Sequence, residues 1–217
     1  MNPKKPHFIE MLEHGSSQVL CVYGTSLSYH LTPHLRDALV GRYGERIKVI
    51  NASISGKASR SGLENLQNRV ISHSPDALMV EFAVNDAHTY FHDPQGIDAG
   101  ITLSESRTNL EAILDMIQVT LPACELILQT TNPAWDPEGN QDKAMTRRPD
   151  LESFYEQYRA VAKARGLQLI DNHSIWAEIQ SGDTDRFERL IPDGVHPTPE
   201  AIKAVLVPHI LAQWAIS

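Results

Sequence analysis

Two groups of residues, far apart in the sequence, have the types and spacing that nucleophilic catalysis needs. Ser26 follows Gly24 directly after an aliphatic run, in a turn where a small residue lets the backbone bend and expose the hydroxyl. Asp193 and His196 stand three residues apart in a turn before the last predicted helix. At that spacing a carboxylate can hold one imidazole nitrogen, which leaves the other free to take a proton from a serine hydroxyl. The ordinary alternatives are a helix N-cap for Ser26 and a packing role for His196.

The elements that must position these residues are five short aliphatic runs, each followed by a turn-rich stretch and a helical pattern. This alternation predicts a parallel sheet with helices on both faces. Short aliphatic strands are typical of parallel sheets, because both of their faces are buried. The predicted strands are Gln18–Tyr23, Ile47–Asn51, Ala77–Phe82, Glu125–Thr130 and Gln168–Asp171.

Apolar residues at three-and-four spacing predict the helices between these strands. The predicted helices are Leu31–Gly41, Gly62–Ser72, Ser104–Leu121, Leu151–Arg165 and Pro199–Trp214. Ser104 before Glu105 has the pattern of an N-cap, Gly166 of a helix stop, and Thr198 before Pro199 of a helix start. The longest irregular stretch, residues 132–150, is polar and rich in Pro and Gly, and we expect it at the mouth of a site.

Ligands of an open α/β sheet bind beyond the carboxyl ends of its strands. That rule nominates residues 24–26, 53–56, 83–86 and 131–132, which follow the first four predicted strands. Ser26 is among them, whereas Asp193 and His196 must approach from the far end of the chain.

Four ordered segments resemble the sequence blocks of the SGNH (GDSL-like) hydrolase superfamily. They span nearly the whole chain, from about residue 19 to about residue 200. Two positions depart from the family pattern: Thr25 stands where the GDSL form has Asp, and Ala83 where Gly is usual. Neither departure removes a catalytic group. The four segments are Gly24–Ser28, Asn51–Gly56, Ala83–Asp86 and Asp193–His196.

The resemblance implies a flavodoxin-like three-layer α/β/α sandwich with a five-stranded parallel sheet, formed by one domain over residues 1–217. It also implies a serine esterase in which Ser26 attacks an ester carbonyl and Asp193 and His196 complete the triad. By the same match, Gly56 and Asn85 donate hydrogen bonds to the oxyanion beside the Ser26 amide. A tetrahedral intermediate needs such donors, each of which contributes about 3–4 kcal/mol to transition-state stabilisation. Gly and Asn are also common turn residues, which is the ordinary alternative for both.

Composition narrows the partners and the compartment. Lys and Arg number 19 against 27 Asp and Glu, a formal net charge of -8, which disfavours nucleic acid. We expect no membrane association and a cytoplasmic protein, because we find neither an apolar run of spanning length nor a signal-peptide pattern. Cys21 and Cys124 both lie in apolar runs and are expected to be free thiols.

No metal and no cofactor is predicted. His88 and His92 are four residues apart, but ligands at that spacing need a helix, and the Asp93–Gly96 stretch that follows reads as a loop. A glycine-rich phosphate-binding loop is not found in the sequence. Asp171 and His173 form a second acid–histidine pair, which ranks well below Asp193 and His196.

The predicted substrate is a small-molecule or saccharide ester, and the predicted activity is that of an O-acetylesterase on a sugar or small glycan. We find no apolar lid or membrane-binding segment that would favour lipid hydrolysis. A lysophospholipase or thioesterase using the same triad, and a non-catalytic carbohydrate-binding relative, stay as alternatives. The oligomeric state is left open. Possible substrate contacts are His88, Tyr90, Asn132 and Trp135, with Arg147 and Arg148 as further candidates.

Overall fold

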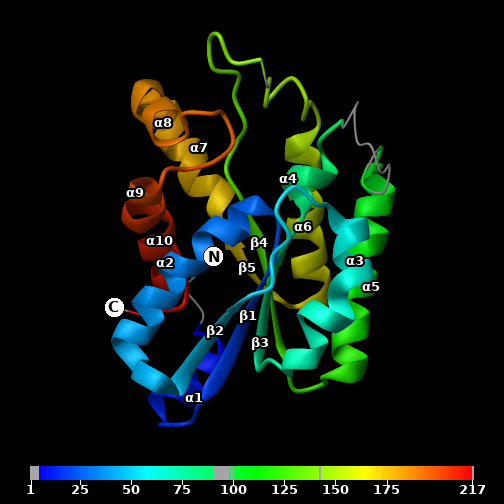
Figure 1. Cartoon of the computed structure of the whole chain (residues 1–217), viewed down its shortest axis with the longest axis vertical. Helices are drawn as coiled ribbons and strands as arrows, with labels where there is room; N and C mark the ends of the chain where they lie inside the picture. The colour runs from blue at the N-terminus through cyan, green and yellow to red at the C-terminus, as the bar shows by residue number, and fades with distance from the viewer. Residues whose placement is uncertain (1–4, 90–97, 99, 142, 217) are drawn as a thin grey trace.

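The computed structural model describes residues 5–89, 98, 100–141 and 143–216. Five parallel strands form one sheet in the order β2-β1-β3-β4-β5, with helices on both faces (Figure 1). This is the flavodoxin-like strand order. The predicted three-layer α/β/α sandwich with a five-stranded parallel sheet is therefore confirmed.

The strands follow the aliphatic runs closely. Three have the predicted bounds, β1 continues one residue further to Gly24, and β3 ends one residue earlier at Glu81. Residues of β1, β3 and β4 are almost all buried, as expected for strands covered on both faces. The strands are β1 Gln18–Gly24, β2 Ile47–Asn51, β3 Ala77–Glu81, β4 Glu125–Thr130 and β5 Gln168–Asp171.

Helices connect the strands and pack on the sheet. Three further turns of helix have other hydrogen-bond patterns: 3-10 turns at Gly44–Arg46 and Ile71–His73, and a π turn at Ile202–Leu206. The α-helices are α1 His7–Glu13, α2 Ser26–Tyr43, α3 Ser59–Arg69, α4 Ala83–Asp86, α5 Leu103–Thr120, α6 Leu151–Arg165, α7 Asn172–Gly182, α8 Thr184–Leu190, α9 Pro199–Ala201 and α10 Val207–Gln213.

The structure corrects several helix predictions. Helix α2 begins at Ser26, five residues before the predicted start, because Thr25 caps it by accepting a hydrogen bond from the Leu27 amide. The predicted cap Ser104 is wrong, since Thr102 accepts from the Glu105 amide and starts α5 at Leu103. Helices α1, α4, α7 and α8 were not predicted.

Other sequence signals are confirmed. Gly166 ends α6 in the left-handed conformation at φ 66°, and Thr198 caps α9 by accepting from the Ala201 amide. Residues 132–150 contain no helix or strand in their described part. Cys21 and Cys124 are free thiols, and burial raises the pKa of each to about 12.

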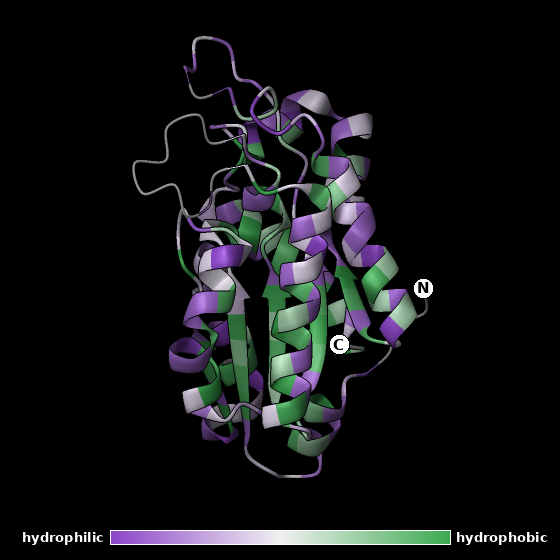
Figure 2. Cartoon of the chain, turned by 90° about the vertical axis from the view of Figure 1, so that its right-hand side faces the viewer, coloured by the Kyte–Doolittle hydropathy of each residue, from purple (hydrophilic) through white to green (hydrophobic). Residues whose placement is uncertain are grey.

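Two hydrophobic clusters lie on opposite faces of the sheet. One contains Tyr23, Phe82 and Tyr158 and is covered by α3, α5 and α6; the other contains Trp176 and Trp214 and is covered by α1, α2, α7 and α10. The strands are hydrophobic along their length, whereas the helices carry hydrophilic residues on their outer sides (Figure 2). In the described part of the chain, no helix has the length and apolar character to cross a membrane.

The chain reverses its direction of travel across the sheet between β1 and β3. The connection after β1 leads to β2 on one side, and the connection after β2 returns to β3 on the other. Sheets of this order bind ligands in the crevice at the carboxyl ends of those strands. Ser26 follows β1 and Asn85 follows β3, so the fold places both at this switch point.

The two glycines Gly166 and Gly41 give opposite predictions for replacement by alanine. An added Cβ meets nothing within 4 Å at either position, so the backbone alone decides. Gly166→Ala forces a left-handed alanine and is expected to cost about 1 kcal/mol of unfolding free energy. Gly41→Ala, inside α2, should add about 0.5–1 kcal/mol. Urea denaturation of both variants checks this prediction. Changes in unfolding free energy of the same sign in both variants would contradict it.

Candidate active site

The turn that carries Ser26 is packed too tightly for any residue but glycine at position 24. A Cβ on Gly24 would lie 2.3 Å from the carbonyl oxygen of Glu81 and 2.8 Å from the Ser28 hydroxyl. Strand β1 therefore runs directly against β3 at its last residue, and the chain then turns into α2 with Ser26 as the first residue. The Ser26 amide lies at the helix N-terminus, where negative charge is favoured.

Glu81, the last residue of β3, fixes this turn through hydrogen bonds to its side chain. Its Oε1 atom accepts hydrogen bonds from the Thr25 amide at 2.8 Å, the Thr25 hydroxyl at 2.6 Å and the Ser28 hydroxyl at 3.0 Å. Position 25, where the GDSL form has Asp, is thus occupied by a threonine that donates to the Glu81 carboxylate. Ser28 in turn accepts from Gln129, which extends the polar network to β4. Thr25, although it departs from the family pattern, therefore still ties the turn to β3 through Glu81.

Burial makes the Glu81 carboxyl a weaker acid than usual. Its side chain is fully buried, and its Oε2 atom has no partner among the described residues. Burial raises the pKa of Glu81 from its ordinary 4.5 to about 7, although the hydrogen bonds from Thr25 and Ser28 act in the opposite direction. Protonated and ionised forms are therefore both accessible near neutral pH.

Ser26, His196 and Asp193 form a continuous hydrogen-bonded series. The Ser26 hydroxyl lies 2.9 Å from Nε2 of His196, and Nδ1 of His196 lies 2.7 Å from Oδ2 of Asp193. Ser26 and His196 are half-buried, and the Asp193 side chain is about half exposed. A hydroxyl, an imidazole and a carboxylate at these distances can transfer a proton from the serine to the histidine.

Asp193 also builds the turn in which His196 lies. Its Oδ1 accepts from the Val195 amide at 2.9 Å and from the His196 amide at 2.6 Å. Partial burial would raise the pKa of Asp193, but the hydrogen bonds from the His196 side chain and from the two amides lower it to about 2. Asp193 is therefore ionised at neutral pH, and it fixes both the position and the hydrogen-bonded nitrogen of His196.

Gly56 lies in a loop that continues from β2 along β1, the strand that precedes Ser26. The Ala52 amide donates to Val22 and the Ile54 amide to Gly24, which carries the ladder past the end of β2. Gly56 has φ 72°, and a Cβ there would meet nothing within 4 Å. A left-handed backbone, rather than close packing within the protein, therefore explains the glycine.

Asn85 reaches toward the same loop from the end of β3. It lies in the short helix α4, it is buried, and its Nδ2 atom donates to the carbonyl oxygen of Lys57 at 2.9 Å. A side-chain amide nitrogen carries two protons, so one remains to serve an oxyanion. Ala83 is the first residue of α4 and is not among the positive-φ residues, so alanine fits where the family pattern has Gly.

The predicted substrate contacts have varied placements. Asn132 is buried and donates to the Val195 carbonyl, and Trp135 is half-buried with its indole N–H donating to the Ile191 carbonyl. His88 is half-buried beyond α4, and its amide donates to the Asn85 carbonyl. Tyr90, like His92 of the rejected metal pair, lies outside the described residues. The residues that the structure describes include no group of three or more His, Cys, Asp or Glu arranged for a metal ion.

The second acid–histidine pair is engaged in a separate ion network. Arg159 donates to both carboxylate oxygens of Asp171, at 2.9 and 3.1 Å, and its guanidinium lies 3.1 Å from Nδ1 of His173. The Nε2 atom of His173 lies 3.0 Å from Glu152. Both ring nitrogens of His173 thus have partners other than a serine.

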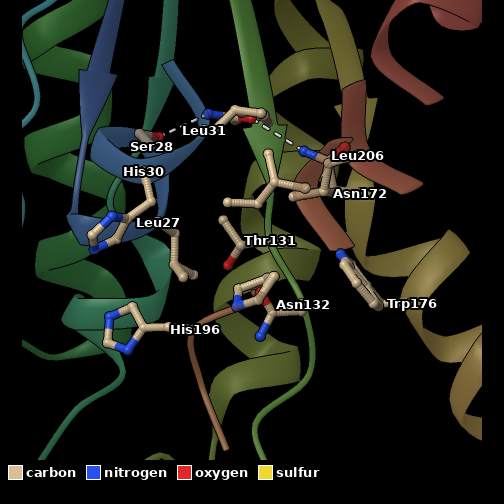
Figure 3. A pocket seen from close by; sticks show the side chains of 13 residues that line it. Leu27, Ser28, His30, Leu31, Thr131, Asn132, Asn172, Trp176, His196 and Leu206 are labelled. Carbon is tan, nitrogen blue, oxygen red and sulfur yellow. Dashed lines mark hydrogen bonds between the residues drawn. The ribbon is translucent and has the colours of Figure 1, made fainter. Parts of the chain in front are cut away.

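A small cavity lies beside His196 on the α2 face of the sheet. Its volume of about 20 Å³ fits one group the size of a water molecule. His30 and His196 lie on one side of it and Trp176 on the other, and the hydrogen bonds linking Ser28, Gln129 and Asn172 run along its inner end (Figure 3). Polar groups therefore continue from the Ser26 turn into the protein interior.

The sequence profile of the GDSL-like Lipase/Acylhydrolase family matches residues 21–204. This range contains all four segments of the predicted resemblance, including the Ser26 turn and the Asp193–His196 turn. The chain belongs to the GDSL-like lipase/acylhydrolase family, as the sequence predicted, and it is a carboxylic ester hydrolase of the SGNH type.

Relatives with known names agree with this class. An arylesterase from Vibrio mimicus is 29% identical over 197 residues, covering 86% of this chain and 83% of that protein. Two solved structures share the fold. A GDSL-like lipase from Parabacteroides merdae has a TM-score of 0.77 at 17% identity, covering 93% of this chain and 97% of its own. Axe2, an acetylxylan esterase from Geobacillus stearothermophilus, has a TM-score of 0.76 at 19% identity, covering 94% of this chain and 96% of its own.

Sequence reasoning missed the part that Glu81 plays in the site. Its signal was available, because a glutamate at the end of the otherwise apolar run Ala77–Phe82 has to be paired if the strand is buried. Which donors meet it depends on the pairing of β1 with β3, in which Gly24 lies opposite Glu81. That pairing is not visible in the sequence.

Replacing Glu81 by Gln should change how stability depends on pH. The amide oxygen keeps an acceptor for the three donors, and the ionisable group is lost. Since the folded state holds a proton that the unfolded chain releases, the wild-type unfolding free energy falls as pH rises from about 4.5 to about 7. Over that range the unfolding free energy of Glu81→Gln should therefore rise relative to that of wild type, by on the order of 3 kcal/mol at pH 8.

Urea denaturation at pH 5 and pH 8 measures this difference. Glu64→Gln, at an exposed position of α3, is the matched control. A difference between Glu81→Gln and wild type that is the same at both pH values would contradict the assignment of Glu81 as a buried acid.

Proposed function

We propose that this chain is a serine esterase that hydrolyses short-chain acyl esters, above all the O-acetyl esters of a sugar or small glycan. The observation that carries the proposal is the series from Ser26 through His196 to Asp193, with distances of 2.9 and 2.7 Å. In a family of ester hydrolases, a hydroxyl bonded to an imidazole that is itself bonded to a carboxylate has the features of an activated nucleophile.

Each residue then has one role in the reaction. His196 takes the proton of Ser26 as its hydroxyl attacks the ester carbonyl, and later gives it to the leaving alcohol oxygen. Asp193 orients His196 and stabilises its protonated form. Water then attacks the acyl-enzyme with His196 again as the base, releasing the acid and restoring Ser26.

Three donors are proposed for the oxyanion. They are the backbone amides of Ser26 and Gly56 and the second proton of the Asn85 side chain. Ser26 lies at a helix N-terminus, and Asn85 is fixed by its bond to the Lys57 carbonyl. Such donors are effective because they need no reorganisation when the charge develops.

The acetyl and sugar preferences draw on the relatives and on the loop above the site. Axe2, whose fold this chain shares, is an acetylxylan esterase, and the Vibrio relative is an arylesterase. Exposed polar side chains on the 132–150 loop, among them Glu138, Gln141 and Lys143, offer hydrogen bonds to a hydroxylated alcohol.

Acyl-chain length and the nature of the alcohol decide the substrate class. We expect p-nitrophenyl acetate to be hydrolysed faster than the octanoate or palmitate ester, and acetate to be released from acetylated xylo-oligosaccharides. Ser26→Ala should lose at least about 10⁴-fold in kcat and keep the wild-type circular dichroism spectrum. Faster turnover of long-chain esters would favour the lysophospholipase or thioesterase alternative. Full activity of Ser26→Ala would overturn the assignment of the nucleophile.

Asparagine and alanine at position 193 are expected to differ. Asp193→Asn keeps an oxygen for the Val195 and His196 amides, but its NH₂ group favours the histidine tautomer with the proton on Nε2, which cannot act as base. A drop of roughly 10⁴-fold in kcat is expected. Asp193→Ala leaves the tautomer free and should cost less. Steady-state kinetics on p-nitrophenyl acetate separates the two, and an Asn variant more active than the Ala variant would contradict the orienting role.

A further inference from the structure

The loop after β4 holds the turn that carries Asp193 and His196. Three of its side chains and one of its amides donate to backbone carbonyls of residues 191–195. The bonds are Asn132 Nδ2 to Val195 at 2.9 Å, Trp135 N to Gly194 at 3.0 Å, Trp135 Nε1 to Ile191 at 2.7 Å and Asn140 Nδ2 to Asp193 at 3.2 Å. Four carbonyls of one short turn thus have donors from a single loop.

The contact between loop and turn is close as well as hydrogen-bonded. Gly194 has φ 88°, and a Cβ on it would lie 2.1 Å from the carbonyl oxygen of Trp135 and 3.1 Å from Cβ of Ala144. The turn therefore fits against the loop only because residue 194 has no side chain. The Trp135 ring packs against the apolar cluster on the α2 face of the sheet.

The loop is fixed internally by one carboxylate. Asp136 accepts from the Met145 amide at 2.8 Å, from the Thr146 amide at 3.3 Å and from the Thr146 hydroxyl at 2.5 Å. These bonds join the two ends of the segment between residues 136 and 146. The residue beside Trp135 is therefore tied to the far end of the loop.

That far end holds the oxyanion side of the site. Arg148 donates through Nε to the carbonyl of Val84 at 2.8 Å, and Val84 directly precedes Asn85. The Thr89 amide, just beyond α4, donates to the Arg147 carbonyl at 2.9 Å. One loop thus contacts both the turn of His196 and the helix of Asn85.

We propose that the described residues 132–141 and 143–148, the brace loop, set the position of His196 relative to the oxyanion donors, and that Trp135 is the principal positioning residue. This inference rests on the proposed function, because it assigns a role toward the same triad. Trp135 contributes two of the four bonds to the turn, and its indole N–H is committed to the Ile191 carbonyl. Its polar atom is thereby turned toward the protein rather than toward a sugar.

Trp135→Phe tests this role, because it keeps an aromatic ring and removes the indole N–H. A shift of about 1 Å in a catalytic group can cost about 10²-fold in rate. We expect kcat for p-nitrophenyl acetate to fall about 10-fold or more, with KM within about 3-fold of wild type. The rate at which a fluorophosphonate modifies Ser26 should fall in parallel, since that reaction needs His196 but none of the ester's alcohol contacts.

Trp214→Phe is the matched control. Trp214 is fully buried beside Phe8, far from the loop, and its indole nitrogen has no partner among the described residues. It reports the effect of shrinking a buried ring, and its kcat should stay near the wild-type value. Asn140→Ala, in the brace loop, removes the hydrogen bond to the Asp193 carbonyl and should lower kcat about 3-fold even if Trp135→Phe folds poorly.

The outcomes separate the roles. Wild-type kcat in both Trp135→Phe and Asn140→Ala would overturn the proposal. A rise in KM for acetylated xylo-oligosaccharides with unchanged kcat and unchanged fluorophosphonate rate would also overturn it, in favour of a substrate contact at Trp135. Activity that survives Ser26→Ala would instead overturn the proposed function, and it is measured independently of the brace-loop variants.

Discussion

The hydrogen bond between the Ser26 hydroxyl and Nε2 of His196 joins residues 170 positions apart, and the site depends on it. The position of each partner is fixed by the elements around it. Ser26 is placed by the end of β1 and the start of α2, and His196 by a turn that precedes α9. A parallel sheet with the order 2-1-3-4-5 brings the strand ends to one edge, and the last segment of the chain must then be held over that edge.

Carboxylates do much of this holding, each in a different environment. Glu81 is buried and fixes the turn of Ser26; Asp86, also buried, accepts from the Ser59 amide and the Ser106 hydroxyl and so ties α3 and α5 to the helix of Asn85. Burial raises the pKa of Glu81 to about 7 and that of Asp86 to about 6. Asp193 is more exposed, and the hydrogen bonds from the His196 side chain and from the Val195 and His196 amides lower its pKa to about 2. The carboxylate that we propose to be charged during catalysis, Asp193, is therefore the one whose ionised form is favoured.

The sequence predicted the sheet well because buried parallel strands are short aliphatic runs, and their bounds agree with the structure to one residue. Helix starts were less predictable, since α2 begins at Ser26 only because Thr25 can serve as its cap. The four segments of the resemblance identified the family. The hydrogen-bond partners of Glu81 and Trp135 could not be predicted, because each depends on a contact between distant segments: β1 against β3 for Glu81, and the loop after β4 against residues 191–195 for Trp135.

The central claim is that Ser26 is the nucleophile activated by His196, and covalent labelling tests it most directly. The protein would be treated with a fluorophosphonate, digested and analysed by mass spectrometry, with His196→Ala treated in parallel. The account predicts a single adduct on the peptide that contains Ser26, localised to that residue, with labelling at least about 10²-fold slower in His196→Ala. An adduct on Ser28 or another residue, or labelling of Ser26 that does not depend on His196, would contradict it.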